Sequence, residues 1–334
     1  MNLRDTISSL IATYAPTGDI QLPGHGHTVA RWQLFATIAA THGPVAIKLF
    51  EAHADALAIL AEVATARPGH DTRWAVWAAE PPDARVSARA APVEDVRALA
   101  NRAGIAHGTP NLLNGRKAWC SGAAGVSHAL LTCHDADGAP LLAAIDVEGP
   151  GVAITTDGWH AAGMGNTSSG DVLLHDCPAL RIGSANAYLE RPGFWHGGAG
   201  IAACWYGAAL PLAWAVRDAV RKHGDAHAAA HLGAIDGDLH GVAALLRETA
   251  AWIDAHPCDD AFTPAMRLRT VAEAAVQRVL HRAGNVLGAG PLCRNARLAA
   301  LYADLPVFLR QSHAERDLAT LGAALSQVEG GYAL

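Results

Sequence analysis

Between Arg73 and about Ile182, short apolar runs alternate with turn signals, and this pattern is the sequence feature that most constrains the fold. The runs follow one another too closely for the helical crossovers that parallel strands need. Asp137-Gly138 between two of the runs is typical of a two-residue hairpin turn. We therefore expect a compact antiparallel β domain. Its expected strands cover residues 74–79, 118–120, 129–133, 141–147, 152–155 and 171–174.

The sequence on both sides of this stretch favours helices. Residues 54–66 are rich in Ala, Leu and Ile, and the Pro-Gly-His-Gly-His run at 23–27 reads as a loop between helices. After about Phe194 apolar residues recur at helical spacing, and Gly288–Pro291 should end one of these helices. We expect three domains: a short helical domain over 1–70, a β domain over 71–185 and a helical bundle over 186–334.

Two apolar faces are predicted for the bundle helices. One comprises Ile235, Leu239, Val242, Leu246 and Ile253. The other comprises Leu268, Val271, Ala275, Val279, Leu280 and Val286. A bundle with surplus apolar surface is expected to bury it in an oligomer.

Composition excludes several classes of protein. A net charge of −6 with 17% charged residues argues against a nucleic-acid binder. The six cysteines form no Cys-x-x-Cys pair, which favours reduced thiols. His227 and His231 lie one helical turn apart, yet without a third ligand nearby a solvated face is the better interpretation than a metal site. We see no signal peptide and no membrane span, so we expect a cytoplasmic protein.

Residues 114–121, Asn-Gly-Arg-Lys-Ala-Trp-Cys-Ser, carry the main chemical signal. Asn-Gly is a strong turn signal, and Trp119 and Ser121 would share one face of a following strand. A flat ring beside a hydroxyl suits a planar, hydrogen-bonding cofactor such as a flavin. The alternative is an ordinary strand with one core aromatic. Cys120 would point to the opposite face as an inert, buried thiol.

The order of the regions and four segments resemble the acyl-CoA dehydrogenase superfamily. Residues 74–81 resemble its strand ending in Thr-Glu-Pro, although the Gly-Ser-Asp that normally follows is missing. Residues 114–121 are similar to its Asn-Gly-x-Lys-x-Trp-x-Thr segment. Residues 163–178 resemble the loop and strand that leave the β domain. Residues 284–304 and 310–322 resemble the flavin region of the bundle.

The resemblance implies a fold, a cofactor and site residues. The expected architecture is an N-terminal helical domain, a central antiparallel β domain and a C-terminal helical bundle. It implies FAD held in a homodimer or homotetramer. Trp119 would lie against the isoalloxazine ring, Ser121 would place its hydroxyl near N5, and Glu80 would border the pocket.

The chain differs from the superfamily at the positions of the catalytic base and of an arginine that binds the cofactor. Acyl-CoA oxidation needs a carboxylate base, and the matching positions hold Arg310 or Gln311, or in the other arrangement Gly197. An amide does not accept a proton at neutral pH. The nearest titratable side chains are His196 and His313, so the acid–base role would fall to them. The Arg that reaches the pyrophosphate of a neighbouring subunit's FAD is replaced by an alanine, Ala229 or Ala230.

Each histidine also has a simpler interpretation. His313 is followed by Glu315, Arg316 and Asp317 and fits a surface position on a helix. His196 fits the first turn of a helix, where backbone groups would satisfy it. Histidine titrates near neutral pH, which favours a catalytic role for either residue.

Three functions follow from the resemblance. The first is an FAD-dependent oxidoreductase acting on an acyl-CoA or another acyl substrate. The second is a flavin-dependent monooxygenase of the same superfamily, since some of its branches lack the Glu and use reduced flavin with oxygen. The third is a non-catalytic, degenerate subunit that supports an active partner chain in a mixed complex. The short N-terminal region and the missing Glu and Arg fit the third hypothesis.

Overall fold

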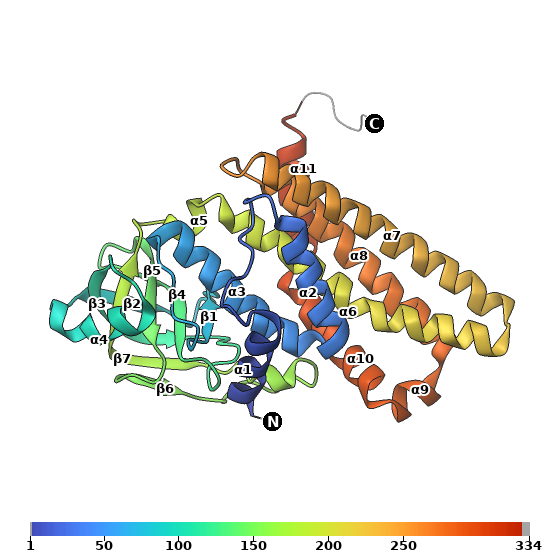
Figure 1. The fold of residues 1–334 in the computed structure, drawn as a ribbon, viewed down its shortest axis with the longest axis horizontal. Coiled ribbons are helices and arrows are strands. Elements are labelled where there is room, and N and C mark those ends of the chain that lie inside the picture. The colour runs from blue at the N-terminus through green and yellow to red at the C-terminus, as the bar shows by residue number, and fades with distance from the viewer. Residues whose placement is uncertain (1, 329–334) are drawn as a thin grey trace. The chain divides into compact units, whose positions relative to one another are not determined.

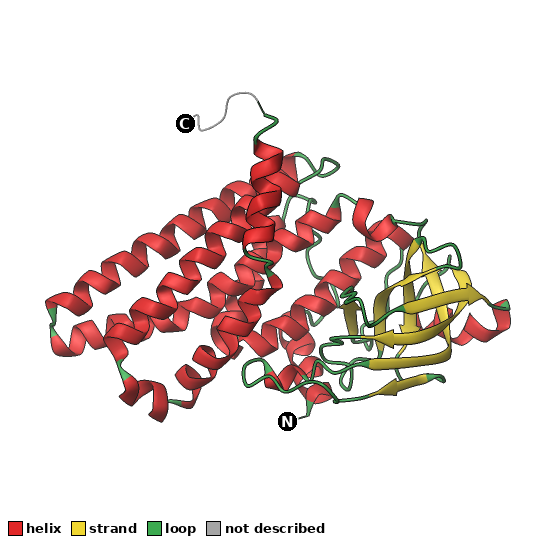
Figure 2. Ribbon diagram, turned by 180° about the vertical axis from the view of Figure 1, so that it is seen from behind, coloured by secondary structure: helices red, strands yellow, loops and turns green. Residues whose placement is uncertain are grey.

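The computed structural model of the chain describes residues 2–328, apart from the side chain of His223 (Figure 1). The predicted order of helices, a β region and a helical bundle is confirmed (Figure 2). The residues form two compact units. The sheet unit contains residues up to Ile20, Lys48–Ala161 and Gly165–Phe194. The helical unit contains Gln21–Ile47, Ala162–Met164 and the chain from Trp195 onward. The division at 70 and 185 stays a prediction.

The sheet unit is built around a seven-stranded sheet. The strand order is β1-β4-β2-β3-β7-β5, with β6 beside β7, and β5 also pairs with β4. The sheet therefore closes on itself. The strands are β1 (Trp74–Trp77), β2 (Val86–Ala90), β3 (Thr109–Lys117), β4 (His128–His134), β5 (Pro140–Asp146), β6 (Val152–Ile154) and β7 (Val172–Ile182).

Most pairs in this sheet are antiparallel, but β1 runs parallel to β4, and β2 meets β4 in a single parallel pair. The expectation of a purely antiparallel sheet is wrong here, because β1 and β4 are separated in sequence by β2, α4 (Val93–Ala103) and β3. That connection is long enough for a parallel return. The Asp137-Gly138 hairpin between β4 and β5 is confirmed, with Gly138 at φ +84°.

The Asn-Gly pair is not a turn. Asn114 and Gly115 lie inside β3, where the register against β7 shifts and Gly115 adopts φ +130°. Asn114 holds this bulge by exchanging hydrogen bonds with Asp176: its Nδ2 donates to Oδ1 at 2.8 Å, and its Oδ1 accepts from the Asp176 N–H at 3.0 Å. The bulge replaces the predicted turn because both flanking halves of β3 pair with the same strand.

Helices α3 (Pro44–Ala64) and α4 cover the sheet and complete its core. Ile59 of α3, Val96 of α4 and Leu130 of β4 are each at most 2% exposed and belong to one apolar cluster. Trp74 of β1 joins them and donates its indole N–H to Thr72 Oγ1 at 2.9 Å. Burying an aromatic of this size is favourable once its polar atom has a partner. Three further helices lie in this unit: α1 (Leu3–Tyr14), η1 (Gly165–Thr167) and α5 (Ala187–Glu190).

The helical unit is a bundle of long helices (Figure 2). Most residues of the two predicted faces are buried, but Val271 is 40% exposed, contrary to expectation. Gly288 ends the helix before it, as predicted. The helices are α2 (Thr28–His42), α6 (Gly193–His223), α7 (Ala226–Ala255), α8 (Phe262–Leu287), α9 (Ala289–Arg294), α10 (Ala296–Phe308), η2 (Leu309–Gln311) and α11 (Glu315–Leu325).

One helix among the described residues meets the length and composition of a membrane span, although the sequence analysis predicts none. It covers Gly193–Lys222 of α6, and 72% of its apolar window is buried inside the structure. A helix in the core of a bundle is apolar on all sides because other helices surround it, and this explains the composition of α6.

Candidate functional site

Two loops of the sheet unit are joined edge to edge at the Trp119 segment. The N–H of Cys120 donates to the Gly170 carbonyl, and the N–H of Gly122 donates to the Thr167 carbonyl, each at 2.8 Å. β3 ends at Lys117, so the predicted strand over 118–120 does not form. Local pairing with the 165–170 loop takes its place.

Both loops contain a residue other than glycine in the left-handed region. Trp119 has φ +57° and Ser168 has φ +45°. Such conformations cost about 1–3 kcal/mol each and concentrate at ligand sites, where surrounding contacts enforce them. Trp119 is 58% exposed, while its neighbour Cys120 is fully buried. Burial raises the pKa of the Cys120 thiol to about 12, which keeps it protonated and unreactive.

A chain of hydroxyls lies directly beside Trp119. Ser121 Oγ and Ser169 Oγ are 2.7 Å apart, and Thr167 Oγ1 is 2.7 Å from the same Ser169 oxygen. Trp77 of β1 fixes the loop by donating its indole N–H to the Ser121 carbonyl at 3.2 Å. Ser121 is the only one of the three hydroxyl residues that is half-buried rather than buried. The segment therefore presents a flat aromatic surface and a hydrogen-bonding hydroxyl. The two side chains belong to a loop, and not to one face of a strand as predicted.

Glu80 belongs to a different polar group. It accepts from Thr132 Oγ1 at 2.6 Å and lies 3.4 Å from the Lys117 ammonium, which also donates to the Thr132 carbonyl at 2.9 Å. His134 Nε2 is 3.5 Å from the other Glu80 oxygen. Glu80 borders a cavity of about 90 Å³, and neither Trp119 nor Ser121 lines that cavity.

His196 lies on α6 in the helical unit and is 2% exposed. Its ring fills the space beside Gly24, where a Cβ would come within 3.2 Å of the imidazole. This is the first-turn position predicted for it, but the side chain is packed rather than presented to solvent. Gly24 and His196 thus depend on each other for close packing.

His313 lies between η2 and α11, and its side chain is 65% exposed. Its backbone N–H donates to Asp317 Oδ2 at 3.0 Å, while its ring Nδ1 is 3.3 Å from Asp317 Oδ1. Ala314 follows with φ +49°, another left-handed residue that is not glycine. A proton held on Nδ1 by Asp317 leaves Nε2 as an acceptor facing away from the carboxylate.

Arg269 of α8 connects the parts of the helical unit that carry both histidines. It donates to the Gly198 carbonyl of α6 at 2.8 Å and to the Gln311 carbonyl of η2 at 2.9 Å. Its guanidinium also lies 5.1 Å from the Trp205 ring centroid. Sequence analysis misses Arg269, and its i, i+3, i+7 spacing with Ala272 and Val276 is the signal that could have placed it on the buried face of α8.

The acid expected at the superfamily's base position is absent from η2. Arg310 is ion-paired with Glu273 of α8, and the Gln311 side-chain oxygen is buried without a hydrogen-bond partner among the described residues. Glu273 is 7% exposed and also accepts from Gln277 Nε2 at 3.1 Å. Its carboxylate is therefore engaged by a cation and an amide.

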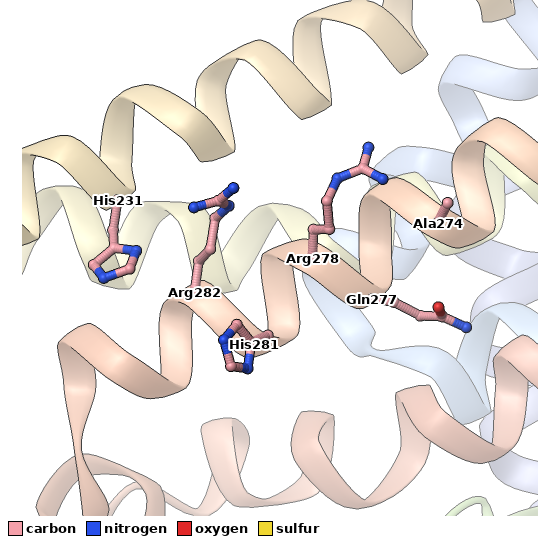
Figure 3. Close-up of a pocket in the computed structure, with 6 residues that line it drawn as sticks. All are labelled: His231, Ala274, Gln277, Arg278, His281 and Arg282. Atoms are coloured by element: carbon pink, nitrogen blue, oxygen red, sulfur yellow. The ribbon is translucent and has the colours of Figure 1, made fainter.

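A groove of about 470 Å³ opens between α7 and α8 in the helical unit. In Figure 3, Arg278 and Arg282 extend from α8 toward α7, from which His231 enters. His281, Ala274 and Gln277 complete the lining. Sequence analysis weighs a metal site at His231 and prefers a solvated helix face, and among the described residues no group of three metal-binding side chains occurs. The i, i+4 spacing of the two arginines is the signal that could have revealed the groove.

No protein-family model matches the sequence, and no curated protein matches it. Solved structures do match it. TdsC, a dibenzothiophene monooxygenase from Paenibacillus sp. A11-2 solved with FMN and indole, has a TM-score of 0.77 at 16% identity, covering 97% of this chain and 88% of that chain. The methanesulfinate monooxygenase MsuC from Pseudomonas fluorescens has a TM-score of 0.70 at 19% identity, covering 99% and 90%.

A nitrososynthase from Micromonospora carbonacea var. africana is similar over 98% of this chain and 94% of its own, with a TM-score of 0.73 at 15% identity. Coverage of nearly the whole chain includes both units. The helical regions, the closed sheet and the bundle therefore have the acyl-CoA dehydrogenase-like fold.

Proposed function

We propose that this chain is a flavin-dependent monooxygenase. The observation that carries the proposal is the match of nearly the whole chain to TdsC and MsuC, both of which are monooxygenases. Among the three hypotheses from sequence, this is the second. A fold alone does not fix a reaction, so the residues of the two units provide the remaining support.

The Trp119 segment fits a flavin. Its exposed indole offers a face for an isoalloxazine ring, and Ser121 offers a hydroxyl at the edge of that face. The strained Trp119 backbone holds the indole outward against the tendency of an aromatic to bury itself. A bound, reduced flavin would supply the electrons that activate dioxygen. The sequence predicts FAD, and TdsC contains FMN, so the proposal covers the flavin ring that both share.

The helical unit supports oxygenation better than acyl-CoA oxidation. Removing a proton next to a thioester needs a base, and the matching positions hold Arg310 and Gln311, both of which lack a carboxylate. His313 and Asp317 instead form an imidazole–carboxylate pair, with His313 Nδ1 3.3 Å from Asp317 Oδ1. We assign proton transfer to His313, while the buried His196 serves packing. The predicted homodimer or homotetramer remains part of this proposal.

Flavin titration tests the cofactor assignment. FMN and FAD are titrated separately into the protein while flavin fluorescence is followed. Trp119→Leu should weaken binding by about tenfold, because stacking on the ring is lost. Trp252→Leu is the matched control, since this tryptophan lies in the helical unit and stacks on His256 at the end of α7. Equal affinity of both variants for flavin would contradict the assignment, and failure of the unaltered protein to bind flavin would favour the degenerate-subunit hypothesis.

A second experiment separates oxygenation from dehydrogenation. The flavin-loaded protein is mixed without oxygen with a series of acyl-CoA thioesters. We expect the oxidised flavin absorbance to persist, whereas bleaching by any thioester would support the dehydrogenase hypothesis. The same protein, chemically reduced and then exposed to ¹⁸O₂ with candidate aromatic and sulfur substrates, should give products that carry one ¹⁸O atom.

A further inference from the structure

We propose that Lys117, Glu80 and Thr132 are positioning residues that hold the Trp119 indole in place for a flavin ring. We call these three residues the Lys117 clasp. The inference rests on the proposed function, since it concerns the segment to which flavin binding is assigned. Trp119 has φ +57° and is 58% exposed. Surrounding contacts have to enforce such a backbone, because it is unfavourable by itself.

The β sheet stops supporting the chain two residues before Trp119. The ladder between β3 and β7 ends at the pair of Lys117 with Val172. In the described part of the chain, the next bond to another segment is made by Cys120, whose N–H donates to the Gly170 carbonyl at 2.8 Å. The two residues in between, one of which is Trp119, therefore depend on how firmly Lys117 is held.

Lys117 is held by its side chain as well as by β3. Its ammonium donates to the Thr132 carbonyl at 2.9 Å and to the Thr132 hydroxyl at 2.7 Å, and it lies 3.4 Å from Glu80 Oε1. The Thr132 hydroxyl donates to the same Glu80 oxygen at 2.6 Å. Thr132 belongs to β4, which is separated from β3 by β2 in the strand order. The Lys117 clasp therefore joins two strands that no ladder joins directly.

Burial makes the Lys117 clasp hard to loosen. The Lys117 side chain is 2% exposed, and three oxygens lie within 3.4 Å of its ammonium. An ammonium has three N–H donors, so the oxygens match them in number. A buried ammonium that lost these oxygens would be left unpaired, which is far less favourable than breaking the same contacts in water. The clasp therefore keeps the end of β3 in one position.

Glu80 connects the Lys117 clasp to the contact on the other side of Trp119. Trp77, the last residue of β1, donates its indole N–H to the Ser121 carbonyl at 3.2 Å, and Glu80 follows Trp77 in the segment that leaves β1. Lys117 and Ser121 flank Trp119, one on each side in the sequence. Both are thus held by the same segment, and the indole between them is fixed from both sides.

Hydrogen exchange in the flavin-free protein tests whether the Lys117 clasp holds residues 118–122. Thr132→Val removes the hydroxyl of the clasp, so the amides of residues 118–122 should exchange about tenfold faster. Thr132→Ser keeps the hydroxyl and should exchange within about twofold of the unaltered protein. Thr109→Val is the matched control, because it removes a hydroxyl at the other end of β3, where it accepts from Arg181 Nη2 at 3.2 Å.

Three results of this experiment would overturn the proposal. The first is that Thr132→Val exchanges at residues 118–122 as Thr109→Val does. The second is that Thr132→Ser exchanges there as fast as Thr132→Val, because the hydroxyl would then be unimportant. The third is that α4 exchanges faster by the same factor in Thr132→Val, because the whole sheet unit would then be loosened.

A double-mutant cycle with FMN tests whether the Lys117 clasp acts through Trp119. Thr132→Val alone should weaken FMN binding about fivefold, and it should weaken it no further in Trp119→Leu, whose indole is already gone. An equal loss in both backgrounds would mean that Thr132 affects FMN by another route, and it would overturn the proposal. If the unaltered protein binds neither FMN nor FAD, the proposed function fails together with the flavin part of this inference, whereas hydrogen exchange still decides whether the clasp holds Trp119.

Discussion

Gly115 occupies a backbone conformation that side chains rarely adopt, at the bulge in β3. Its φ is +130°, and a Cβ built on it would lie 2.2 Å from the Arg85 carbonyl oxygen. The position therefore requires glycine for two reasons, conformation and space. The bulge it permits sets the direction of the chain that leads on to Lys117 and Trp119.

Gly115→Ala should lower the free energy of unfolding by about 2–4 kcal/mol, because backbone strain and the clash with Arg85 add. Gly158→Ala separates the two causes, since Gly158 has φ +78° but open space around it. The control should lose about 1 kcal/mol, the price of the conformation alone. Urea denaturation measures both values, and equal losses would show that the clash relaxes.

Lys117 is a buried charge of the sheet unit, with a side chain 2% exposed. Burial lowers its pKa below the ordinary 10.5, although Glu80 acts in the opposite direction. Between the lowered folded-state pKa and 10.5, the unfolded chain holds a proton that the folded protein lacks. Stability contributed by this group therefore rises with pH across that window.

The difference in unfolding free energy between the unaltered protein and Lys117→Met should accordingly increase as pH rises toward 10.5. Denaturation at a series of pH values from neutral upward measures it. Lys222→Met, at an exposed position of α6, serves as the reference and should show a flat difference. A falling difference for Lys117→Met would mean that Glu80 outweighs burial.

Individual residues also show how far sequence predicts this site. Trp119 and Ser121 are predicted as site residues because a ring and a hydroxyl two residues apart are visible in any sequence. The sequence does not predict their geometry, because the left-handed backbone at Trp119 is imposed by pairing with residues 165–170, some 50 positions away. The prediction of a turn at Asn114-Gly115 is wrong for the same reason. Contacts with the distant residues Asp176 and Arg85 accompany the bulge that forms there.

Among the elements, α8 links segments of the helical unit that are far apart in sequence. Through Arg269 it holds both α6 and η2, and through Glu273 it pairs with Arg310. Helix periodicity predicts which residues of α8 are buried and apolar. It does not predict that a buried arginine on the same face satisfies two carbonyls of other elements, because those partners lie 42 and 71 residues away.

Arg269→Met should destabilise the protein by about 2–4 kcal/mol, since the Gly198 and Gln311 carbonyls both lose a charged donor. Hydrogen exchange should also quicken in residues 309–314, which carry His313. Arg267→Met tests the effect of charge removal alone, because Arg267 is exposed on the neighbouring position of α8. Unchanged exchange around His313 in Arg269→Met would remove Arg269 from its proposed positioning role.

At the scale of the whole molecule, the predicted succession of helices, strands and helices is confirmed because local periodicity determines it. The sequence analysis does not predict the strands β2 and β3 or the helix α4, because polar residues interrupt their apolar positions. The parallel pairing of β1 with β4 depends on which of several distant strands lies beside β1. The periodicity of a single segment carries no information about its partner strand. The groove at Arg282 likewise arises from two helices together, α7 and α8.

Self-association is predicted from apolar groups left on the helical unit, including Trp214 on α6, which is 40% exposed. Trp214→Glu should shift the protein toward a smaller species, because a charge would have to be desolvated in the interface. Light scattering after gel filtration measures the mass. Val93→Glu, at a 59% exposed position on α4, should leave the mass unchanged. A monomeric unaltered protein would refute the predicted oligomer.

Each of the two units is built from several separate segments of the chain, which limits how the protein can be divided into fragments. The polypeptide passes from one unit to the other five times, after Ile20, Ile47, Ala161, Met164 and Phe194. No single break in the gene yields a fragment containing one complete unit and nothing else. Limited proteolysis, circular permutation and fragment complementation would each have to respect these interleaved segments, so both halves must be synthesised together before either is whole.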